Sequence, residues 1–294
     1  MDFDVVVIGA GPAGLQAAIQ IARKKASVAV VGKASGSALH GASISNYLGT
    51  GTVPGEDLLS EGRVQAVDAG AVLMESDVIG ASGSDGVFRT ELDNGDVLVS
   101  RAIVLATGVS REKLGVPGEK EFFGKGVSYC AVCDCNFYKG RRVAVIGNGS
   151  EAAVAAELMT GYASETHWIR WASEASEHLV SKAVAAGAVV HDSRPVSIDG
   201  EARVGSVTLE DGAVIPVDGI FIELGARSSV DLAMDLGAMP EFDDSLKVDR
   251  ACATGVPGLF ACGDITGRPY QVAKAVGEGC VAGMSAADHA RGTR

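Results

Sequence analysis

The chain has 294 residues, of which 47% are hydrophobic and 21% charged, and its formal net charge is −12 at pH 7. The length fits about two domains, and the acidic balance argues against nucleic acid as a partner, because phosphate binding needs concentrated lysine and arginine. The N-terminal stretch lacks the basic region of a signal peptide and no apolar run reaches the roughly 18 residues of a membrane span, so we expect a cytoplasmic protein with no membrane partner.

The first predicted element is a buried parallel strand over Asp4–Ile8, followed by a glycine-rich turn and a helix over Leu15–Arg23. Gly9, Gly11 and Gly14 in this turn have GxGxxG spacing. The first glycine allows a tight turn, the second lets the backbone approach a pyrophosphate, and the third lets the helix pack closely on the strand. The spacing alone is weak, but its strand and helix context indicates a dinucleotide site at the helix N-terminus.

The second predicted strand, Ser27–Val31, departs from the usual pattern of such a site. An acidic residue normally ends this strand and binds the ribose hydroxyls, but Gly32 and Lys33 follow it here. We therefore expect the ribose to be contacted through the backbone or by Lys33.

A pair of cysteines stands near the middle of the chain. Cys130 and Cys133 are two residues apart, and Asp134 and Cys135 follow directly. In a cytosolic setting such a pair is redox-active or metal-binding far more often than structural. Zinc needs four ligands, and the sequence has no second CxxC or HxxxH spacing, so we expect no metal site. Cys135 is either a packed thiol, which we favour, or a third redox thiol.

Two further segments point to nucleotide chemistry. A second glycine-rich turn, GNGSEA at 147–152, has the form that would hold a pyridine nucleotide. Near the C-terminus an apolar strand ends in Gly263 and Asp264, whose carboxylate can bond the ribityl chain of a flavin. Gln271–Ala287 then predicts a helix whose N-terminus stabilises negative charge on a reduced isoalloxazine. A dithiol between two nucleotide-binding segments indicates a flavin enzyme that exchanges electron pairs with a disulfide.

These motifs, in this order, resemble the low-molecular-weight thioredoxin reductases over nearly the whole chain. The resemblance rests on GAGPAGL at 9–15, Asn46-Tyr47, ATG at 106–108, GVSYCAVCD at 126–134, FYKG at 137–140, VAVIGNGSEA at 143–152, TGVPGLFACGD at 254–264 and AVGEG at 275–279. It implies an α/β fold with two Rossmann-like, three-layer nucleotide-binding domains, FAD, a homodimer, and reduction of a disulfide in thioredoxin or a similar small protein. The implied cofactor-binding residues are Gly9, Gly11, Pro12, Ala13, Gly14, Lys33, Asn46, Ala106, Thr107, Gly108, Gly263, Asp264, Gln271 and Val272.

The resemblance also implies catalytic roles and a domain division. Cys133 takes the charge-transfer role beside the flavin, Cys130 attacks the partner's disulfide, and Asp134 is the acid/base. The FAD-binding domain is discontinuous, 1–112 and 240–294. The central domain of pyridine-nucleotide type, 113–239, carries the dithiol. Hinges are expected near 113–118 and 225–229.

One motif of the family is missing. Family members grip the 2′-phosphate of NADPH with a His-Arg-Arg cluster, whose place is taken here by Arg170, Trp171 and Ala172, and Ser176 replaces a later arginine. One cation is a poor clamp for a phosphate dianion, and no acidic residue stands where it would select NADH. The segment Gln271–Lys274 is similar to that of members that use ferredoxin or a deazaflavin. The sequence thus favours a donor other than NADPH and leaves the use of NAD(P)H open.

Two alternatives stand beside the thioredoxin reductase interpretation. A dithiol oxidase of the same fold would pass electrons from a small-molecule dithiol to oxygen. A flavin-bearing redox sensor or binding module would have lost its donor site. The intact CAVCD at 130–134 disfavours the sensor, because a sensor needs no acid/base aspartate.

Overall fold

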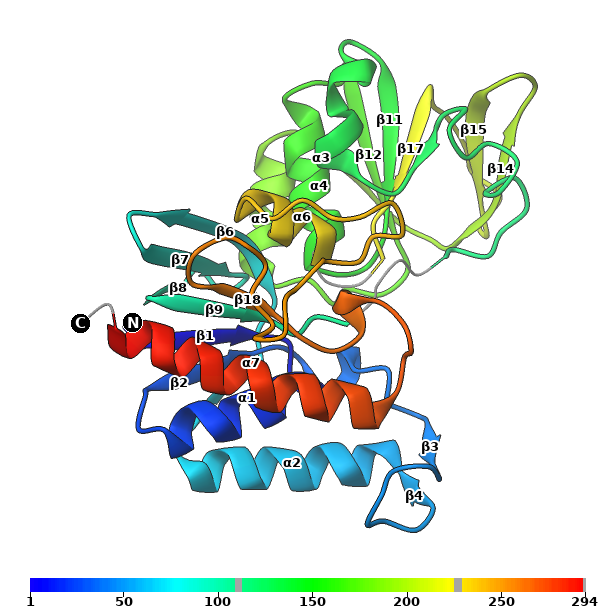
Figure 1. Cartoon of the computed structure of the whole chain (residues 1–294). Helices are drawn as coiled ribbons and strands as arrows, with labels where there is room; N and C mark the ends of the chain where they lie inside the picture. The colour runs from blue at the N-terminus through cyan, green and yellow to red at the C-terminus, as the bar shows by residue number, and fades with distance from the viewer. Residues whose placement is uncertain (109–112, 225–228, 293–294) are drawn as a thin grey trace. The chain divides into compact units, whose positions relative to one another are not determined.

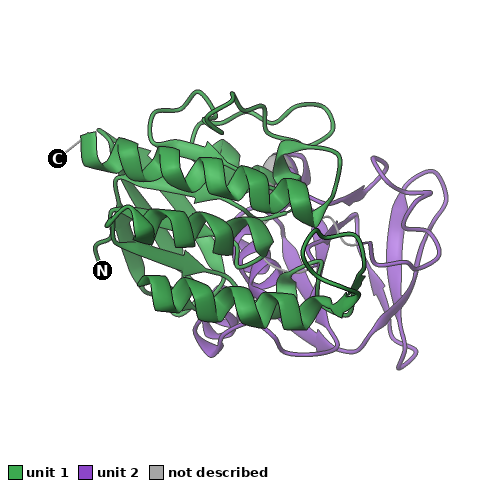
Figure 2. Ribbon diagram, turned by 60° about the horizontal axis from the view of Figure 1, so that its bottom comes forward, with its two compact units in different colours: residues 1–110, 228–294 green, residues 111–227 purple. Residues whose placement is uncertain are grey.

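The computed structural model divides the chain into two compact units, Met1–Ser110 with Ser228–Arg294, and Arg111–Arg227 (Figure 2). It describes residues 1–108, 113–224 and 229–292, without the side chains of Cys133 and Ser229. The expected hinge at 225–229 therefore falls mostly outside the described residues. No helix in the described part of the chain is long and apolar enough to cross a membrane.

The first unit is built on a five-stranded parallel sheet with the order β18-β9-β1-β2-β5. Its strands are β1 (Val5–Ile8), β2 (Val28–Val31), β5 (Val72–Met74), β9 (Ala102–Leu105) and β18 (Leu259–Ala261). Its helices α1 (Pro12–Arg23), α2 (Gly55–Ala69) and α7 (Val272–Gly292) lie on one face of the sheet (Figure 1). An antiparallel sheet of β6 (Val78–Ser84), β7 (Val87–Leu92) and β8 (Val97–Ser100) covers the other face. Helices, parallel sheet and antiparallel sheet make three layers.

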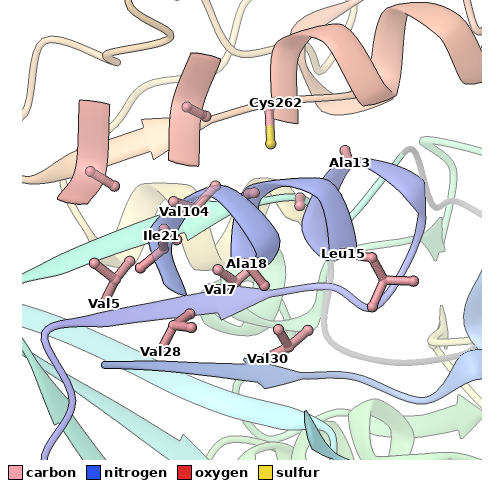
Figure 3. Packing of buried hydrophobic residues seen from close by; sticks show 14 of the residues in the cluster. Val5, Val7, Ala13, Leu15, Ala18, Ile21, Val28, Val30, Val104 and Cys262 are labelled. Atoms are coloured by element: carbon pink, nitrogen blue, oxygen red, sulfur yellow. The ribbon is translucent and has the colours of Figure 1, made fainter. Parts of the chain in front are cut away.

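The period of two along β1 explains how one sheet serves two cores. Val5 and Val7 pack with the helices, whereas Val6 and Ile8 pack with the antiparallel layer. All four are buried, as expected for a parallel strand covered on both faces. Figure 3 shows the helical side of this core, where Val5, Val7 and residues of α1 gather.

Helices α1 and α7 pack at unusually close range because α7 presents glycine to α1. A Cβ added at Gly279 would lie 2.2 Å from the carbonyl oxygen of Ala13, and one added at Gly283 would lie 2.4 Å from that of Ala17. This close approach holds the middle of α7 against the first half of α1.

The second unit repeats the plan with the strand order β10-β17-β11-β12-β13, again parallel. The strands are β10 (Val127–Ser128), β11 (Arg142–Ile146), β12 (Glu165–Arg170), β13 (Val189–Asp192) and β17 (Gly219–Ile222). The helices are α3 (Ala131–Asp134), η2 (Cys135–Tyr138), α4 (Ser150–Thr160) and α5 (Glu177–Ala185). An antiparallel sheet of β14 (Pro195–Gly200), β15 (Val204–Leu209) and β16 (Val214–Pro216) packs its apolar side chains into the same core.

The fold predicted from the sequence, α/β with two Rossmann-like domains, is confirmed. The second unit ends at Arg227, whereas the predicted central domain ends at 239. The difference is helix α6 (Ser229–Asp235), which packs on β6. Leu232 and Ala233 of α6 join the core beneath the first unit's antiparallel sheet. The short elements η1 (Ala34–Gly36), β3 (Ser43–Ile44), β4 (Val53–Pro54) and η3 (Asp264–Thr266) also belong to the first unit.

Candidate functional site

The first glycine-rich turn sits where β1 meets α1. Gly9 has φ +114°, and a Cβ there would lie 2.3 Å from the carbonyl oxygen of Ala106. A Cβ at Gly14 would lie 1.9 Å from the carbonyl oxygen of Gly9. Both positions therefore require glycine. The turn and the Ala106–Gly108 segment after β9, predicted as parts of one site, lie side by side.

The N-terminus of α1 suits an anion. Gly11 caps the helix with no side-chain hydrogen bond, and the first turn holds no acidic residue. The first N–H groups of a helix have no partner within it, and the helix dipole adds positive potential there. A Cβ at Gly11 would meet only the Ser37 hydroxyl, at 3.6 Å. An open helix start with a bare backbone is what a dinucleotide pyrophosphate requires.

The turn after β18 lies against this site. Gly263 has φ +83°, and a Cβ there would lie 2.8 Å from the Cβ of Ala13. The Asp264 carboxylate next to it is partly buried and accepts none of the hydrogen bonds found among the described residues. Burial raises the pKa of Asp264; the Lys274 ammonium acts in the opposite direction, and the Glu278 carboxylate adds to the rise. A partly buried carboxylate without a protein donor is suited to accept hydrogen bonds from hydroxyls of a ligand.

A lysine clamp holds this turn to the first turns of α7. The Lys274 ammonium donates to the Gly263 carbonyl and to the Thr266 hydroxyl, both at 2.8 Å. It also lies 3.2 Å from Glu278, whose carboxylate accepts from the Gly263 N–H at 2.9 Å. The four groups fix the turn that presents Asp264.

Two other predicted residues have clear positions. Asn46 donates its side-chain N–H to the Gln271 side chain at 2.8 Å, which brings together two residues assigned to the cofactor from distant parts of the sequence. Lys33 points its ammonium at buried Asp77, at 2.7 Å, with Asp93 at 3.9 Å. Because two carboxylates hold this ammonium, the Lys33 backbone is the better candidate for a ribose contact.

The cysteine pair lies at a one-turn helix, α3. Cys130 precedes the helix, is 8% exposed and is disulfide-bonded. The side chain of Cys133 lies outside the described residues. Asp134 ends the helix and is partly exposed. Cys135 is a buried free thiol that donates to the Val132 carbonyl, and this burial favours the packing role.

The entrance to α3 is held by two side chains. The Cys130 N–H donates to the Ser128 hydroxyl at 3.1 Å. The Ala131 N–H, the first of the helix, donates to the Glu223 carboxylate at 2.7 Å. Glu223 follows β17 and is 4% exposed. A buried carboxylate thus lies at the start of helix α3, the one-turn helix that follows Cys130 (the dithiol turn).

The second glycine-rich turn is tied to the loop that follows β12. The Asn148 side-chain oxygen accepts the N–H groups of Trp171, at 2.9 Å, and Ala172, at 3.2 Å. The Asn148 carbonyl accepts those of Glu174 and Ala175, both at 3.1 Å. Four hydrogen bonds therefore close the loop onto the turn.

Residues that replace the expected phosphate clamp have structural partners. Arg170 donates to Asp192 at 2.6 Å, and Ser176 caps α5 by accepting from the Leu179 N–H at 3.5 Å. The Arg194 guanidinium lies over the Trp171 ring, 5.4 Å from the ring centroid.

The two glycine-rich turns also differ in charge. The first turn of α4 carries Glu151, which is 6% exposed, whereas the first turn of α1 carries no acid. A carboxylate in the first turn interacts favourably with the positive end of the helix dipole and opposes a second anion there.

Sequence reasoning missed Asn148, Glu223 and Lys274 as organising residues. Asn148 stood inside the quoted GNGSEA, but its spacing to 171–175 carries no periodic signal. Glu223 directly follows an apolar strand, and a charged residue in that position is the one local sequence sign of a structural role.

Comparison with known proteins agrees with this geometry. The model of the pyridine nucleotide-disulphide oxidoreductase family matches residues 3–279. The thioredoxin reductase of Listeria innocua is 33% identical over 298 residues, covering 97% of this chain and 92% of that protein. The crystal structure of the atypical thioredoxin reductase TRi from Desulfovibrio vulgaris Hildenborough is 38% identical with a TM-score of 0.82, covering 98% of both chains. A ferredoxin-flavin thioredoxin reductase from Clostridium acetobutylicum is 30% identical with a TM-score of 0.67, covering 98% of this chain and 97% of that one.

Proposed function

The chain belongs to the pyridine nucleotide-disulphide oxidoreductase family, whose thioredoxin reductases use FAD, and we propose that it is a flavin-dependent reductase of thioredoxin or a similar small disulfide protein. The observation that carries the proposal is the short helix α3, with disulfide-bonded Cys130 at its start and Asp134 at its end. The likeness to proteins named thioredoxin reductase over nearly the full chain supports the same partner class.

The first unit fits FAD. Gly9 and Gly14 shape the turn, Gly11 leaves room for a pyrophosphate, and the start of α1 supplies backbone N–H groups to it. Asp264 would accept hydrogen bonds from the ribityl hydroxyls, while Lys274 holds its turn in place. When bound, FAD supplies the electron pair that reduces a disulfide.

The exchange step uses the cysteine pair. The Cys130 thiolate attacks one sulfur of the partner's disulfide, forming a mixed disulfide and releasing a partner thiolate. Cys133 then attacks Cys130, closing the pair and releasing the second partner thiolate. Two electrons and two protons pass to the partner, and Asp134 moves the protons. The exposed side chains of Val132 and Phe137 beside the pair, 45% and 75% accessible, offer apolar surface for the partner.

A donor other than NADPH is favoured by the second unit. Asn148 holds the loop that would bind the 2′-phosphate, and Arg170 is already paired with Asp192. Glu151 adds a negative charge to the first turn of α4, which opposes the binding of a pyrophosphate there. Losing two or three charge-assisted contacts of about 1.5–3 kcal/mol each weakens NADPH binding by several orders of magnitude. A reduced ferredoxin, as the Clostridium relative's name suggests for that protein, or a reduced deazaflavin takes its place.

The test measures thioredoxin reduction by enzyme whose flavin has been photoreduced without oxygen. Because light supplies the reduced flavin, the result does not depend on the identity of the natural electron donor. The parent protein is expected to reduce thioredoxin stoichiometrically, while Cys130→Ser and Cys133→Ser are expected to keep a reducible flavin and lose transfer. Cys280→Ser, which removes a free thiol of the first unit, is the matched control and should behave as the parent. Thioredoxin reduction at the parent rate by either pair variant would refute the role of the dithiol.

The cytoplasmic location and the homodimer remain proposals of the sequence and of the family likeness. The dithiol oxidase is told apart by fast oxygen consumption without thioredoxin turnover. The redox sensor is told apart by slow turnover with every donor.

A further inference from the structure

We propose that Glu223 is a positioning residue of the dithiol: its carboxylate anchors the first N–H of α3 and disfavours the thiolate of Cys130. The inference rests on the proposed function, because it concerns the cysteine that would attack the partner. Neither the sequence motif nor the family resemblance assigned a role to this glutamate.

The backbone around Glu223 leaves it little freedom. Its N–H donates to the Ile146 carbonyl at 2.9 Å at the end of the β17–β11 pairing. The carbonyl oxygen of Glu223 lies 1.9 Å from where a Cβ at Gly147 would be, so the segments after β17 and β11 approach so closely that position 147 must be glycine. From this fixed point the side chain reaches the Ala131 N–H at 2.7 Å. The carboxylate thus connects the end of a central strand to the start of the dithiol turn.

Glu223 takes up the first N–H of α3, one of the donors that give a helix start its positive potential. Reactive cysteines at helix N-termini gain thiolate stability from the first free N–H groups and from the dipole. Here α3 is a single turn, its first N–H is bound to a carboxylate, and the Cys130 N–H is bound to the Ser128 hydroxyl. The start of α3, directly after Cys130, therefore carries a carboxylate.

Ionisable groups of both signs lie around α3. Asp134 ends the helix itself, and Glu151 lies buried in the first turn of α4, which packs on α3. Tyr138 of η2, also in contact with α3, has its pKa raised by burial and then by Asp134, while Arg203 and Arg141 act in the opposite direction. Next to Cys130, the Tyr129 hydroxyl donates to buried Glu119 at 2.7 Å.

A like charge close to a thiol disfavours its thiolate, and the Glu223 carboxylate accepts the N–H of the residue directly after Cys130. Removing the Glu223 charge is therefore expected to lower the titration midpoint of Cys130 by about one unit. At pH 7 the tenfold gain in thiolate is partly offset by its weaker nucleophilicity, so alkylation should accelerate about threefold.

The experiment measures the rate of Cys130 alkylation by iodoacetamide against pH in the FAD-loaded full chain, with the modified residue located by tandem mass spectrometry. A Cys133→Ser background leaves Cys130 as the single thiol of the pair. Glu223→Gln keeps an acceptor for the Ala131 N–H and removes the charge. The matched control is Asp218→Asn, which removes a carboxylate that accepts the Arg142 N–H at the other end of β17. Five residues of extended strand separate Asp218 from Glu223 by about 16 Å, so the control carboxylate lies at the opposite end of β17 from the one that accepts the Ala131 N–H.

The expected result is a midpoint about one unit lower in Glu223→Gln and unchanged in Asp218→Asn. Equal midpoints in the parent and Glu223→Gln would overturn the proposal. Should Glu223→Gln fail to fold, the parent still tests the proposal, because a Cys130 midpoint below the ordinary cysteine value of about 8.5 refutes it. Alkylation needs neither the donor nor thioredoxin, so failure of thioredoxin reduction would leave this result readable.

Discussion

Replacing Asp264 with alanine tests whether its carboxylate binds FAD or stabilises the fold. Hydrogen bonds to a charged group contribute about 1.5–3 kcal/mol, so Asp264→Ala should raise the dissociation constant for FAD by about 10- to 150-fold. The apoprotein should lose no stability, because the carboxylate accepts no hydrogen bond among the described residues.

The direction of the Asp264 pKa supports the second half of this prediction. Burial raises the folded-state pKa, so the stability linked to this group is present below its unfolded pKa and lost as the pH rises through the folded value. At neutral pH the apoprotein therefore holds a carboxylate that folding disfavours. The melting temperature of the Asp264→Ala apoprotein at pH 7 should equal or exceed that of the parent.

The assay pairs FAD titration of the apoprotein with thermal unfolding of the same samples. Asp249→Ala is the matched control, since Asp249 accepts the N–H groups of Ala251 and Ala253 at 2.8 and 2.9 Å in the same unit. It should lower the apoprotein melting temperature by about 2–4 °C for each kcal/mol lost, with little change in FAD affinity. Parent-like FAD affinity in Asp264→Ala would refute the assignment, and so would a fall in its apoprotein stability.

Four further predictions concern the flavin, the turn that Lys274 holds, and the thiols. Heat-released cofactor should be FAD, because GAGPAG provides a pyrophosphate site that FMN would leave empty; FMN on chromatography would contradict this. Lys274→Met should lower the melting temperature of both apoprotein and holoprotein, since the loss of its bonds to Gly263 and Thr266 costs about 1–3 kcal/mol; unchanged melting would show that the clamp contributes nothing. Cys135→Ser should keep most of the thioredoxin-reducing rate, and a loss above about tenfold, or roughly 1.4 kcal/mol of barrier, would make it a redox thiol. Cys252, whose pKa burial raises to about 11, and Cys262, whose pKa burial also raises, should resist alkylation at pH 8 in the folded protein; rapid labelling there would show that the first unit opens.

Local patterns predicted the elements that follow from short-range physics. The apolar run before Gly9 and the GxGxxG spacing predicted β1 and α1, observed at Val5–Ile8 and Pro12–Arg23. The helix predicted over 271–287 begins at Val272 and runs on to Gly292. These elements depend on periodicity and glycine geometry within about 20 residues.

Long-range polar contacts could not be predicted in this way. The bond from Ala131 to Glu223 spans 92 positions, and that from Asn46 to Gln271 spans 225. No periodicity relates such partners, because the sheet order brings them together. The extent of the helix after Cys130 is also beyond local patterns: α3 is one turn long, since it gives way to the 3-10 turn η2 at Cys135.

The most direct test of the central claim is anaerobic stopped-flow reduction of the bound flavin, with oxidised thioredoxin present, by NADPH, NADH, reduced ferredoxin and reduced deazaflavin in turn. We predict slow bleaching with both pyridine nucleotides and no strong preference between them. Rapid bleaching is expected with ferredoxin or deazaflavin, followed by reoxidation as thioredoxin is reduced. Rapid bleaching by NADPH with micromolar half-saturation would contradict the account, and would mean that other lysines or arginines of the second unit rebuild the phosphate clamp.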